Sequence, residues 1–415
     1  MIAGMQSTPK SLRLHIGIFG RRNVGKSSLL NAITRQQVSI VSAFAGTTTD
    51  PVEKPMELLP LGPVLFVDTA GVDDEGALGE LRMARTRAVL DRVDLGVLVT
   101  EAGGWGAFEE SLLAELTARR VKALVVFNKA DERRPSAEER EKLAATGLPF
   151  VAVSATTGEG MLDLREALLR LAPSEFLESR YLISDLVPPG EAAVLVIPID
   201  KEAPKGRIIL PQVMAIRDLL DGGSMAVVAQ AHELRRALEG LTRPPALVVT
   251  DSQAFAEVAA DVPVDVPMTS FSILMARFQG DLPEQVRGTL AIEGLGEGDR
   301  VLVAETCTHH PIGDDIGRVK IPKWLQEYVG ASLSFEYVQG RDFPATEALQ
   351  RYKLIVHCGN CTGNRREMIS RILRARTAGV PITNYGLTIA YSLGIFERAL
   401  VPFPAALEAF HAAAI

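Results

Sequence analysis

Residues 12–33 read LRLHIGIFGRRNVGKSSLLNAI, which is an apolar strand, a glycine-containing loop and the start of a helix. The central segment GRRNVGKS, Gly20 to Ser27, has the spacing of a phosphate-binding loop in the matching strand–loop–helix context. Backbone N–H groups and the helix N-terminus would surround phosphate, and Lys26 would neutralise the outer phosphates. The hydroxyl of Ser27 would bind Mg²⁺. The stretch therefore predicts an α/β nucleotide-binding domain.

Three later stretches fit the same domain in order, each at the exit of an apolar strand. They are PVLFVDTAG (63–71), ALVVFNKAD (123–131) and FVAVSAT (150–156). The first stretch supplies a carboxylate for the magnesium shell and a backbone amide that senses the γ-phosphate. An aspartate in the second would accept both N–H groups of guanine, whereas adenine offers an acceptor there, so the pattern selects GTP. The residues concerned are Asp68, Gly71, Asn128, Lys129, Asp131, Ser154 and Ala155.

With these four motifs, the first domain resembles the TrmE/Der/Era branch of the translation-factor-related GTPases. The resemblance implies that Thr48, in AGTTTDP, closes over Mg²⁺ when GTP is bound, and that Gly20, Gly25 and Ser28 line the nucleotide. Asn23 matches the asparagine that helps hold K⁺ against the phosphates. Val72 stands where Ras-like proteins carry a water-positioning glutamine, which implies slow hydrolysis that K⁺ stimulates. For Asn23, the other interpretation is a loop residue that only tolerates the turn.

Composition limits the class of protein. The chain of 415 residues predicts two or three domains, and its net charge of −7 argues against a broad nucleic-acid-binding face. We expect no membrane span and no secretory signal in MIAGMQSTPK, and hence a cytoplasmic protein. Three cysteines are an odd number, which makes a disulfide framework improbable and favours a metal-binding or catalytic use.

Strand and helix patterns alternate again after the first domain. The short apolar runs AAVLVIPI (192–199), MAVVAQ (225–230) and ALVVTD (246–251) predict a parallel sheet, with Pro211 near the start of a helix. No cluster of polar side chains converges there, so we expect a scaffolding or dimerising role. We predict an overall α/β fold with mainly parallel sheets, divided into a GTP-binding domain (1–175), a dimerisation domain (180–268) and a third α/β domain (269–415) that contains the three cysteines.

The cysteines follow two apolar strands of the third domain. DRVLVAETC ends at Cys307, and YKLIVHC ends at Cys358, three residues before Cys361. Because the carboxyl ends of parallel strands share one edge of a sheet, we expect the three thiols to converge. The helix that starts soon afterwards would favour thiolates there.

Three kinds of site are compatible with these thiols. A redox couple of Cys358 and Cys361 would leave Cys307 without a role. A Cys₃His zinc site satisfies the ligand count, but structural zinc sites more often use two close pairs of ligands. An iron–sulfur cluster on three thiolates and a weaker fourth ligand would leave one iron open to exchange.

The arrangement Cys307-x-His309, 47 residues, then His357-Cys358-x-x-Cys361 resembles the signature of the HydF family of [FeFe]-hydrogenase maturation GTPases. The resemblance covers essentially the whole chain, including the stretch PKGRIILPQV (204–213). It implies a 4Fe-4S cluster on the three cysteines. His309, His357 and Asp314 are the candidates for the fourth ligand, and either histidine would alternatively orient a thiolate.

On this resemblance the protein is a scaffold and carrier. It would accept a two-iron subcluster precursor from two radical-SAM maturation enzymes and deliver it to apo-[FeFe]-hydrogenase, with GTP hydrolysis (catalytic Lys26, Thr48, Asp68, Gly71) as its only enzymatic step. We expect a homodimer or a tetramer and no nucleic-acid partner. The alternative is a TrmE/Der-like GTPase that acts on RNA or the ribosome and carries a structural zinc domain. A redox-sensing GTPase is a third interpretation.

Overall fold

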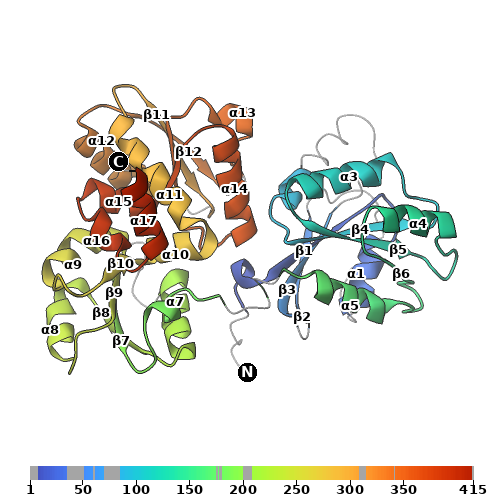
Figure 1. Ribbon diagram of the computed structural model, residues 1–415, viewed down its shortest axis with the longest axis horizontal. Coiled ribbons are helices and arrows are strands. Elements are labelled where there is room, and N and C mark those ends of the chain that lie inside the picture. The colour runs from blue at the N-terminus through green and yellow to red at the C-terminus, as the bar shows by residue number, and fades with distance from the viewer. Residues whose placement is uncertain are drawn as a thin grey trace. The chain divides into compact units, whose positions relative to one another are not determined.

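The computed structural model describes residues 8–34, 51–58, 61–69, 85–173, 176, 180–199, 208–307, 315–340 and 342–413. The chain divides into two compact units, Met1–Ser179 and Arg180–Ile415 (Figure 1). The residues of the sequence predictions that lie outside the described part of the chain are Thr48, Gly71, Val72, His309 and Asp314.

The first unit is built on a six-stranded sheet in the order β2-β3-β1-β4-β5-β6. Only the edge strand β2 runs antiparallel, and it contains Pro55, which a central strand would not tolerate because proline cannot donate to the ladder. The strands are β1 (Leu14–Phe19), β2 (Val52–Leu58), β3 (Gly62–Asp68), β4 (Leu95–Glu101), β5 (Lys122–Asn128) and β6 (Phe150–Ala152).

Helices cover both faces of this sheet (Figure 1). The apolar sides of α1 (Lys26–Thr34) and α5 (Met161–Leu171) pack on one face. The helical residues 85–90, α3 (Ala107–Ala118) and α4 (Ala137–Ala145) cover the other. Because both faces are covered, β1 is buried at every position and β4 at all but its last, rather than alternating, and their carboxyl ends meet at one edge.

The second unit contains two four-stranded sheets, both entirely parallel. The first has the order β10-β9-β7-β8, and Pro211 lies in the first turn of its helix α7, as the sequence predicted. Its elements are β7 (Ala192–Val196), α7 (Leu210–Asp221), β8 (Met225–Ala229), α8 (Leu234–Glu239), β9 (Leu247–Thr250), α9 (Phe255–Asp261), β10 (Met268–Ser270) and α10 (Phe271–Gln279).

The second sheet of this unit has the order β12-β11-β13-β14. One of its faces packs on α13 and α14. Its strands are β11 (Arg300–Glu305), β12 (Ser334–Gln339), β13 (Leu354–His357) and β14 (Ile382–Asn384). The helices around it are α11 (Leu282–Thr289), α12 (Ile321–Val329), α13 (Thr346–Leu349), α14 (Arg365–Thr377), α15 (Tyr385–Ser392), α16 (Phe396–Leu400) and α17 (Pro404–Ala413).

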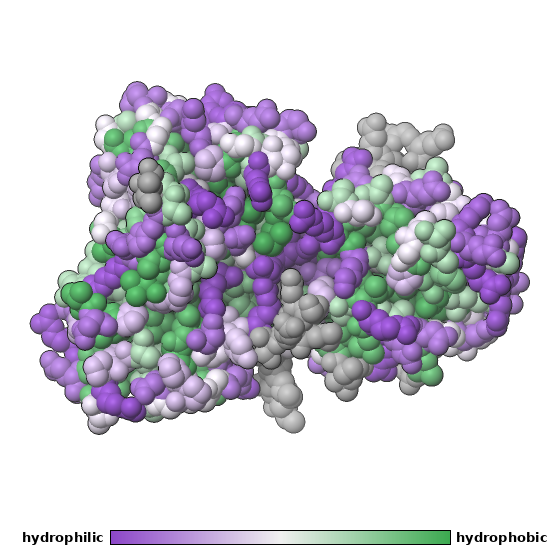
Figure 2. All heavy atoms as spheres, viewed as in Figure 1, coloured by the Kyte–Doolittle hydropathy of each residue, from purple (hydrophilic) through white to green (hydrophobic). Residues whose placement is uncertain are grey.

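Short helical turns connect these elements. In the described part of the chain, 3₁₀ turns lie at Lys10–Leu12, Ser184–Leu186, Ala231–Glu233, Ser252–Ala254 and Leu290–Gly294, and Ile316–Lys320 forms a π turn. Figure 2 shows hydrophobic residues scattered among hydrophilic ones on the surface of both units. None of the helices in the described ranges is long and apolar enough to cross a bilayer.

The predicted fold class, a P-loop domain followed by mainly parallel α/β sheets, is confirmed. The predicted boundary after residue 268 falls inside the short strand β10, which pairs with β9. The division into three domains stays a prediction.

Candidate functional site

The phosphate-binding loop lies between β1 and α1, at the carboxyl edge of the first sheet. Gly20 and Gly25 have positive φ angles of 150° and 85°. A Cβ at Gly20 would lie 2.3 Å from the Val99 carbonyl oxygen, and one at Gly25 would lie 2.3 Å from Nδ2 of Asn128. Both positions therefore require glycine. Asn23 has a φ of 64°, a left-handed conformation that asparagine tolerates better than most residues.

The buried Lys26 side chain folds back over this loop. Its Nζ donates to the carbonyl oxygens of Gly20 (2.9 Å) and Arg21 (2.6 Å), so the ammonium group lies at the centre of the loop. Ser28 is exposed in the first turn of α1. This arrangement gives a bound phosphate a cation and a ring of backbone N–H groups.

Ser27 and Asp68 meet beside the loop. The Ser27 hydroxyl donates to Oδ2 of Asp68 at 2.8 Å, while Oδ1 is buried without a hydrogen-bond partner among the described residues. Burial raises the pKa of Asp68 above its ordinary value, although Ser27 and then Lys26 act in the opposite direction. A hydroxyl and a buried carboxylate with an unused oxygen are oxygen donors of the kind that Mg²⁺ prefers. These two side chains therefore fit a magnesium ion.

Asn128 connects the phosphate end of the site to the base end. Its Nδ2 donates to the Val24 carbonyl oxygen (2.9 Å), and its Oδ1 accepts from the Ala155 N–H group (3.1 Å). Lys129, with a φ of 59°, pairs with Glu101 (2.5 Å), and Asp131 is exposed in the following turn.

Ser154 is fully buried, and its hydroxyl accepts from the N–H group of Thr157 at 3.0 Å. The predicted residues of ALVVFNKAD and FVAVSAT thus lie in the neighbouring loops that follow β5 and β6.

One link in this site was not predicted. Arg21 forms a bidentate ion pair with the buried Glu109 of α3 and lies over the ring of Phe108. Glu109 also accepts from the Gly106 N–H group. The partners are 88 residues apart, so no local pattern indicated the contact.

The cysteines gather at the carboxyl edge of the third sheet. The adjacent strands β11 and β13 pair Ala304 with His357, and the Cys358 N–H group donates to the Ala304 carbonyl oxygen at 2.9 Å. In the order β12-β11-β13-β14 the direction in which the chain adds strands reverses between β11 and β13, and crevices of open α/β sheets form outside the strand ends at such a point. The three thiols lie there, all partly buried.

Each of these cysteines makes it harder for its neighbours to ionise to thiolates. Burial raises the pKa of Cys307 to about 12, with further contributions from Cys358 and Cys361. Burial, and then Cys358, raises the pKa of Cys361 to about 11. A bound cation would therefore have to displace the protons. The stabilisation of thiolates by the N-terminus of the helix that follows stays a prediction.

No group of three or more His, Cys, Asp or Glu side chains within the described ranges is arranged to hold a metal ion. His309 and Asp314, two of the predicted ligands, belong to the segment outside those ranges. The donor chemistry of three neighbouring cysteines nevertheless fits an iron–sulfur cluster, which thiolates usually hold.

The side chain of His357 points away from solvent and uses both ring nitrogens. Nδ1 lies 2.7 Å from the Cys358 carbonyl oxygen and Nε2 lies 2.9 Å from Nη1 of Arg371. The guanidinium can only donate, so Nε2 accepts and Nδ1 carries the proton. Burial, and then Arg371, lowers the pKa of His357 to about 3. To ligate iron, His357 would first have to break one of these bonds, so its role as a ligand stays a prediction that carries this cost.

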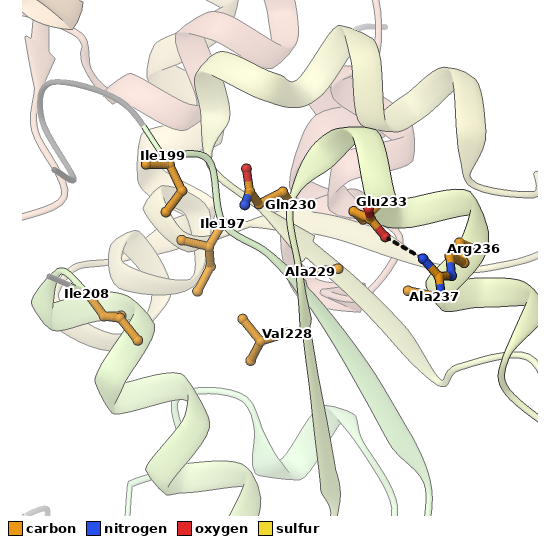
Figure 3. A pocket seen from close by; sticks show the side chains of 9 residues that line it. All are labelled: Ile197, Ile199, Ile208, Val228, Ala229, Gln230, Glu233, Arg236 and Ala237. Carbon is orange, nitrogen blue, oxygen red and sulfur yellow. Dashed lines mark ion pairs between the residues drawn. The ribbon is translucent and has the colours of Figure 1, made fainter. Parts of the chain in front are cut away.

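The middle sheet carries a pocket of about 550 Å³ beside the ends of β7 and β8 (Figure 3). Its lining is mainly aliphatic. The ionic side chains there, Glu233 and Arg236, pair with each other at 3.8 Å instead of converging on the space. The other lining residues are Ile197, Ile199, Ile208, Val228, Ala229, Gln230 and Ala237.

Comparisons with known proteins divide the chain between two groups. Residues 15–129 match the family model of the 50S ribosome-binding GTPase. Residues 182–280 match that of the hydrogen maturase F dimerization domain, and residues 281–402 match that of its tetramerization domain. The last two support an oligomeric protein.

Two curated relatives each match less than half of the chain. The tRNA modification GTPase MnmE of Heliobacterium modesticaldum is 36% identical over 157 residues, which are 37% of this chain and 33% of that protein. GTPase Der of Wolinella succinogenes is 34% identical over 180 residues, 41% and 38% of the two chains. The chain thus spans about a third of the length of the curated relatives it matches.

Two solved structures resemble part of the chain. An Era variant of Aquifex aeolicus bound to GDP and AlF₄⁻ is 20% identical, with 52% of this chain and 91% of that chain covered and a TM-score of 0.36. The G domain of T. maritima FeoB is 24% identical, with 38% and 98% covered and a TM-score of 0.29.

The matched N-terminal part is a GTPase domain, of the kind that binds GTP or GDP with Mg²⁺. The two hydrogen maturase F models adjoin at residue 280 and together cover more than half of the chain. This chain belongs to the hydrogen maturase F (HydF) family.

Proposed function

We propose that this protein is a GTPase of [FeFe]-hydrogenase maturation that acts as a scaffold and carrier. In this role it binds a 4Fe-4S cluster through Cys307, Cys358 and Cys361, accepts a two-iron subcluster precursor from two radical-SAM maturation enzymes and delivers it to apo-[FeFe]-hydrogenase. The observation that carries the proposal is the gathering of the three thiols at the crevice between β11 and β13. Family membership supports it.

The first unit would hydrolyse GTP. Lys26 holds the outer phosphates, Ser27 and Thr48 bind Mg²⁺, Asp68 orients the magnesium shell and Gly71 senses the γ-phosphate. Asp131 selects guanine, with Asn128, Lys129, Ser154 and Ala155 shaping the base pocket. Hydrolysis is slow because Val72 cannot orient the attacking water. K⁺ bound beside Asn23 stimulates it. The place of Asn23 within the phosphate-binding loop supports this role, whereas its left-handed backbone fits either interpretation.

The cysteines hold the cluster as thiolates. When bound, the cluster supplies an iron with an exchangeable fourth position, and His309, His357 and Asp314 are the candidates for it. The hydrogen bonds of His357 to Arg371 and the Cys358 carbonyl oxygen favour His309 or Asp314. His357 then keeps the thiolate loop in place from behind.

The GTPase relatives suggest a second function, action on RNA or the ribosome, because two of them are named for tRNA modification and for the ribosome. The match to the ribosome-binding GTPase model ends at residue 129, within the first unit, and the net charge of −7 argues against a broad phosphate-binding surface. We therefore propose no nucleic-acid partner. GTP binding, which orders switch segments in such domains, would alter contacts with the maturation enzymes.

The test is the iron and acid-labile sulfide content of anaerobically purified protein, with EPR spectra, compared with the Cys358→Ser variant. Thr362→Ser, an exposed position in the same loop, is the matched control. Near-equal iron and sulfide, lost only in Cys358→Ser, is the expected result. Protein loaded with precursor should then activate apo-hydrogenase. Stoichiometric zinc without sulfide, persisting after anaerobic reconstitution, would refute the proposal and favour the RNA-linked function.

A further inference from the structure

Two uncharged side chains next to the cysteines hold each other across the crevice. Thr306 precedes Cys307 at the end of β11, and Asn360 lies between Cys358 and Cys361. The Thr306 hydroxyl donates to Oδ1 of Asn360 at 2.8 Å, although the two residues are 54 positions apart. The contact therefore ties the lone cysteine's strand to the loop of the paired cysteines.

The bonds of Thr306 extend to the sulfur itself. Its N–H group donates to Sγ of Cys358 at 3.3 Å, and its hydroxyl oxygen lies 3.7 Å from the same sulfur. Burial raises the pKa of Cys358, and the backbone N–H groups of Asn360 and Thr306 counteract this by stabilising the thiolate. Two backbone N–H groups thus stabilise negative charge on the Cys358 sulfur.

Asn360 uses its whole side chain in this arrangement. Its Nδ2 donates to the Asn364 carbonyl oxygen at 3.0 Å, and Asn364 in turn caps α14 by accepting from the Glu367 N–H group at 3.1 Å. Asn360 is 1% exposed, and its φ of 56° is a left-handed conformation. A buried residue in this conformation, with both amide atoms bonded, fixes the course of the loop.

Gly363 shows how tightly this contact is enclosed. A Cβ there would lie 2.2 Å from Oδ1 of Asn360 and 2.7 Å from Cγ2 of Thr306. No side chain fits without breaking the bond between the two residues. We call Thr306, Asn360 and Gly363 the clamp.

We propose that Thr306 and Asn360 are positioning residues: their side-chain contact holds Cys358 as the anchored ligand of the cluster and keeps backbone N–H groups aimed at its sulfur, and that alignment sets the reduction potential. The inference rests on the proposed function, because it needs a cluster at this site. Hydrogen bonds to the sulfur ligands disperse negative charge, so they favour the reduced cluster. A cluster anchored at Cys358 keeps its place while ligand exchange occurs at the fourth position.

The experiment compares Thr306→Val, which keeps the shape but loses the hydroxyl, with Thr306→Ser, which restores the hydroxyl. Thr362→Val is the control, an exposed threonine in the same loop. After anaerobic reconstitution of the full chain, EPR-monitored titration gives the midpoint potential, and an iron chelator gives the rate of cluster loss. We expect Thr306→Val to lose iron about 10-fold faster and to have a more negative midpoint potential. Thr306→Ser and Thr362→Val should behave as the wild type.

Asn360→Gly provides a second route, because glycine keeps the left-handed turn and removes only the amide. It should match Thr306→Val in both readouts, and near-UV circular dichroism reports whether each variant is folded. If the wild type binds the cluster and the folded variants lose iron at the same rate and have the same midpoint potential, the inference is overturned while the proposed function stands. Wild type that holds no iron and sulfide would overturn the proposed function, and the inference with it.

Discussion

Replacing Asn128 by alanine should weaken nucleotide binding far more than its single side chain suggests. The amide joins two loops that must be in register for one nucleotide to touch both, the phosphate loop at Val24 and the base loop at Ala155. Asn128 is 2% exposed, so water does not replace its bonds.

The magnitude follows from what the substitution leaves behind. Removing the amide orphans the buried Val24 carbonyl oxygen, at a cost of about 1–3 kcal/mol, and the part-buried Ala155 N–H group, at the lower end of that range, about 1 kcal/mol. Taking about 2–4 kcal/mol for the pair, the affinity would fall by roughly 30- to 900-fold if the whole cost fell on the bound state. Any part that falls on the free domain would lower its stability instead.

Two measurements separate these parts. Titration with a fluorescent GDP analogue gives the affinity. Urea unfolding followed by Trp105, in a Trp324→Phe background where it is the only tryptophan, gives the stability of the first unit. Asn31→Ala, on α1, is the control, since the Asn31 amide oxygen accepts from Lys54 and does not join the two loops. Losses in affinity and stability that together stay below about 1 kcal/mol would refute the reasoning.

Three further substitutions test other parts of the chain. Lys26→Ala should abolish GTP binding by equilibrium dialysis yet leave iron and sulfide unchanged, because the cysteines lie in the other compact unit; cluster loss in folded protein would contradict independent sites. Burial lowers the pKa of His15 to about 4, from 6.5 unfolded, so the unfolded chain binds more protons in this window. The stability of the first unit should therefore fall by about 1.4 kcal/mol per pH unit below 6.5, and His15→Gln should flatten this slope in urea unfolding at pH 7 and pH 5. Equal slopes would show that another group titrates. Gly363→Ala should lower cluster content by forcing apart Asn360 and Thr306, and wild-type iron retention would mean that the loop has room to shift.

Much of the fold could be predicted because its signals are local. The apolar strands that end in Asp68 and Asn128 carry their own turn chemistry, and their alternation with helices indicated parallel sheets. The convergence of Cys307 with Cys358 followed from the rule that parallel strands share a carboxyl edge.

Long-range contacts could not be predicted in this way. The direction of the His357 ring depends on Arg371 and on the ring of Phe343, which come from other elements. Strand β10 is only three residues long, too short for a recognisable pattern, so the boundary at residue 268 was drawn through it. Thr306 stands at the end of DRVLVAETC and Asn360 between the paired cysteines, but only the structure brings them together.

The loop of paired cysteines rests on α10, and this bears on how the chain can be dissected. A Cβ at Gly359 would lie 3.4 Å from the Met275 Cβ, and Arg365, just after the loop, donates to the Gly280 carbonyl oxygen at 2.6 Å. A fragment of residues 281–415 would lack α10, on which the loop packs. A fragment that begins at residue 269 would separate β10 from its neighbour β9. Chimeras between members of this family should therefore exchange residues 180–415 as one piece, since a junction at 281 separates the cysteine loop from α10 and a junction at 269 separates β10 from β9.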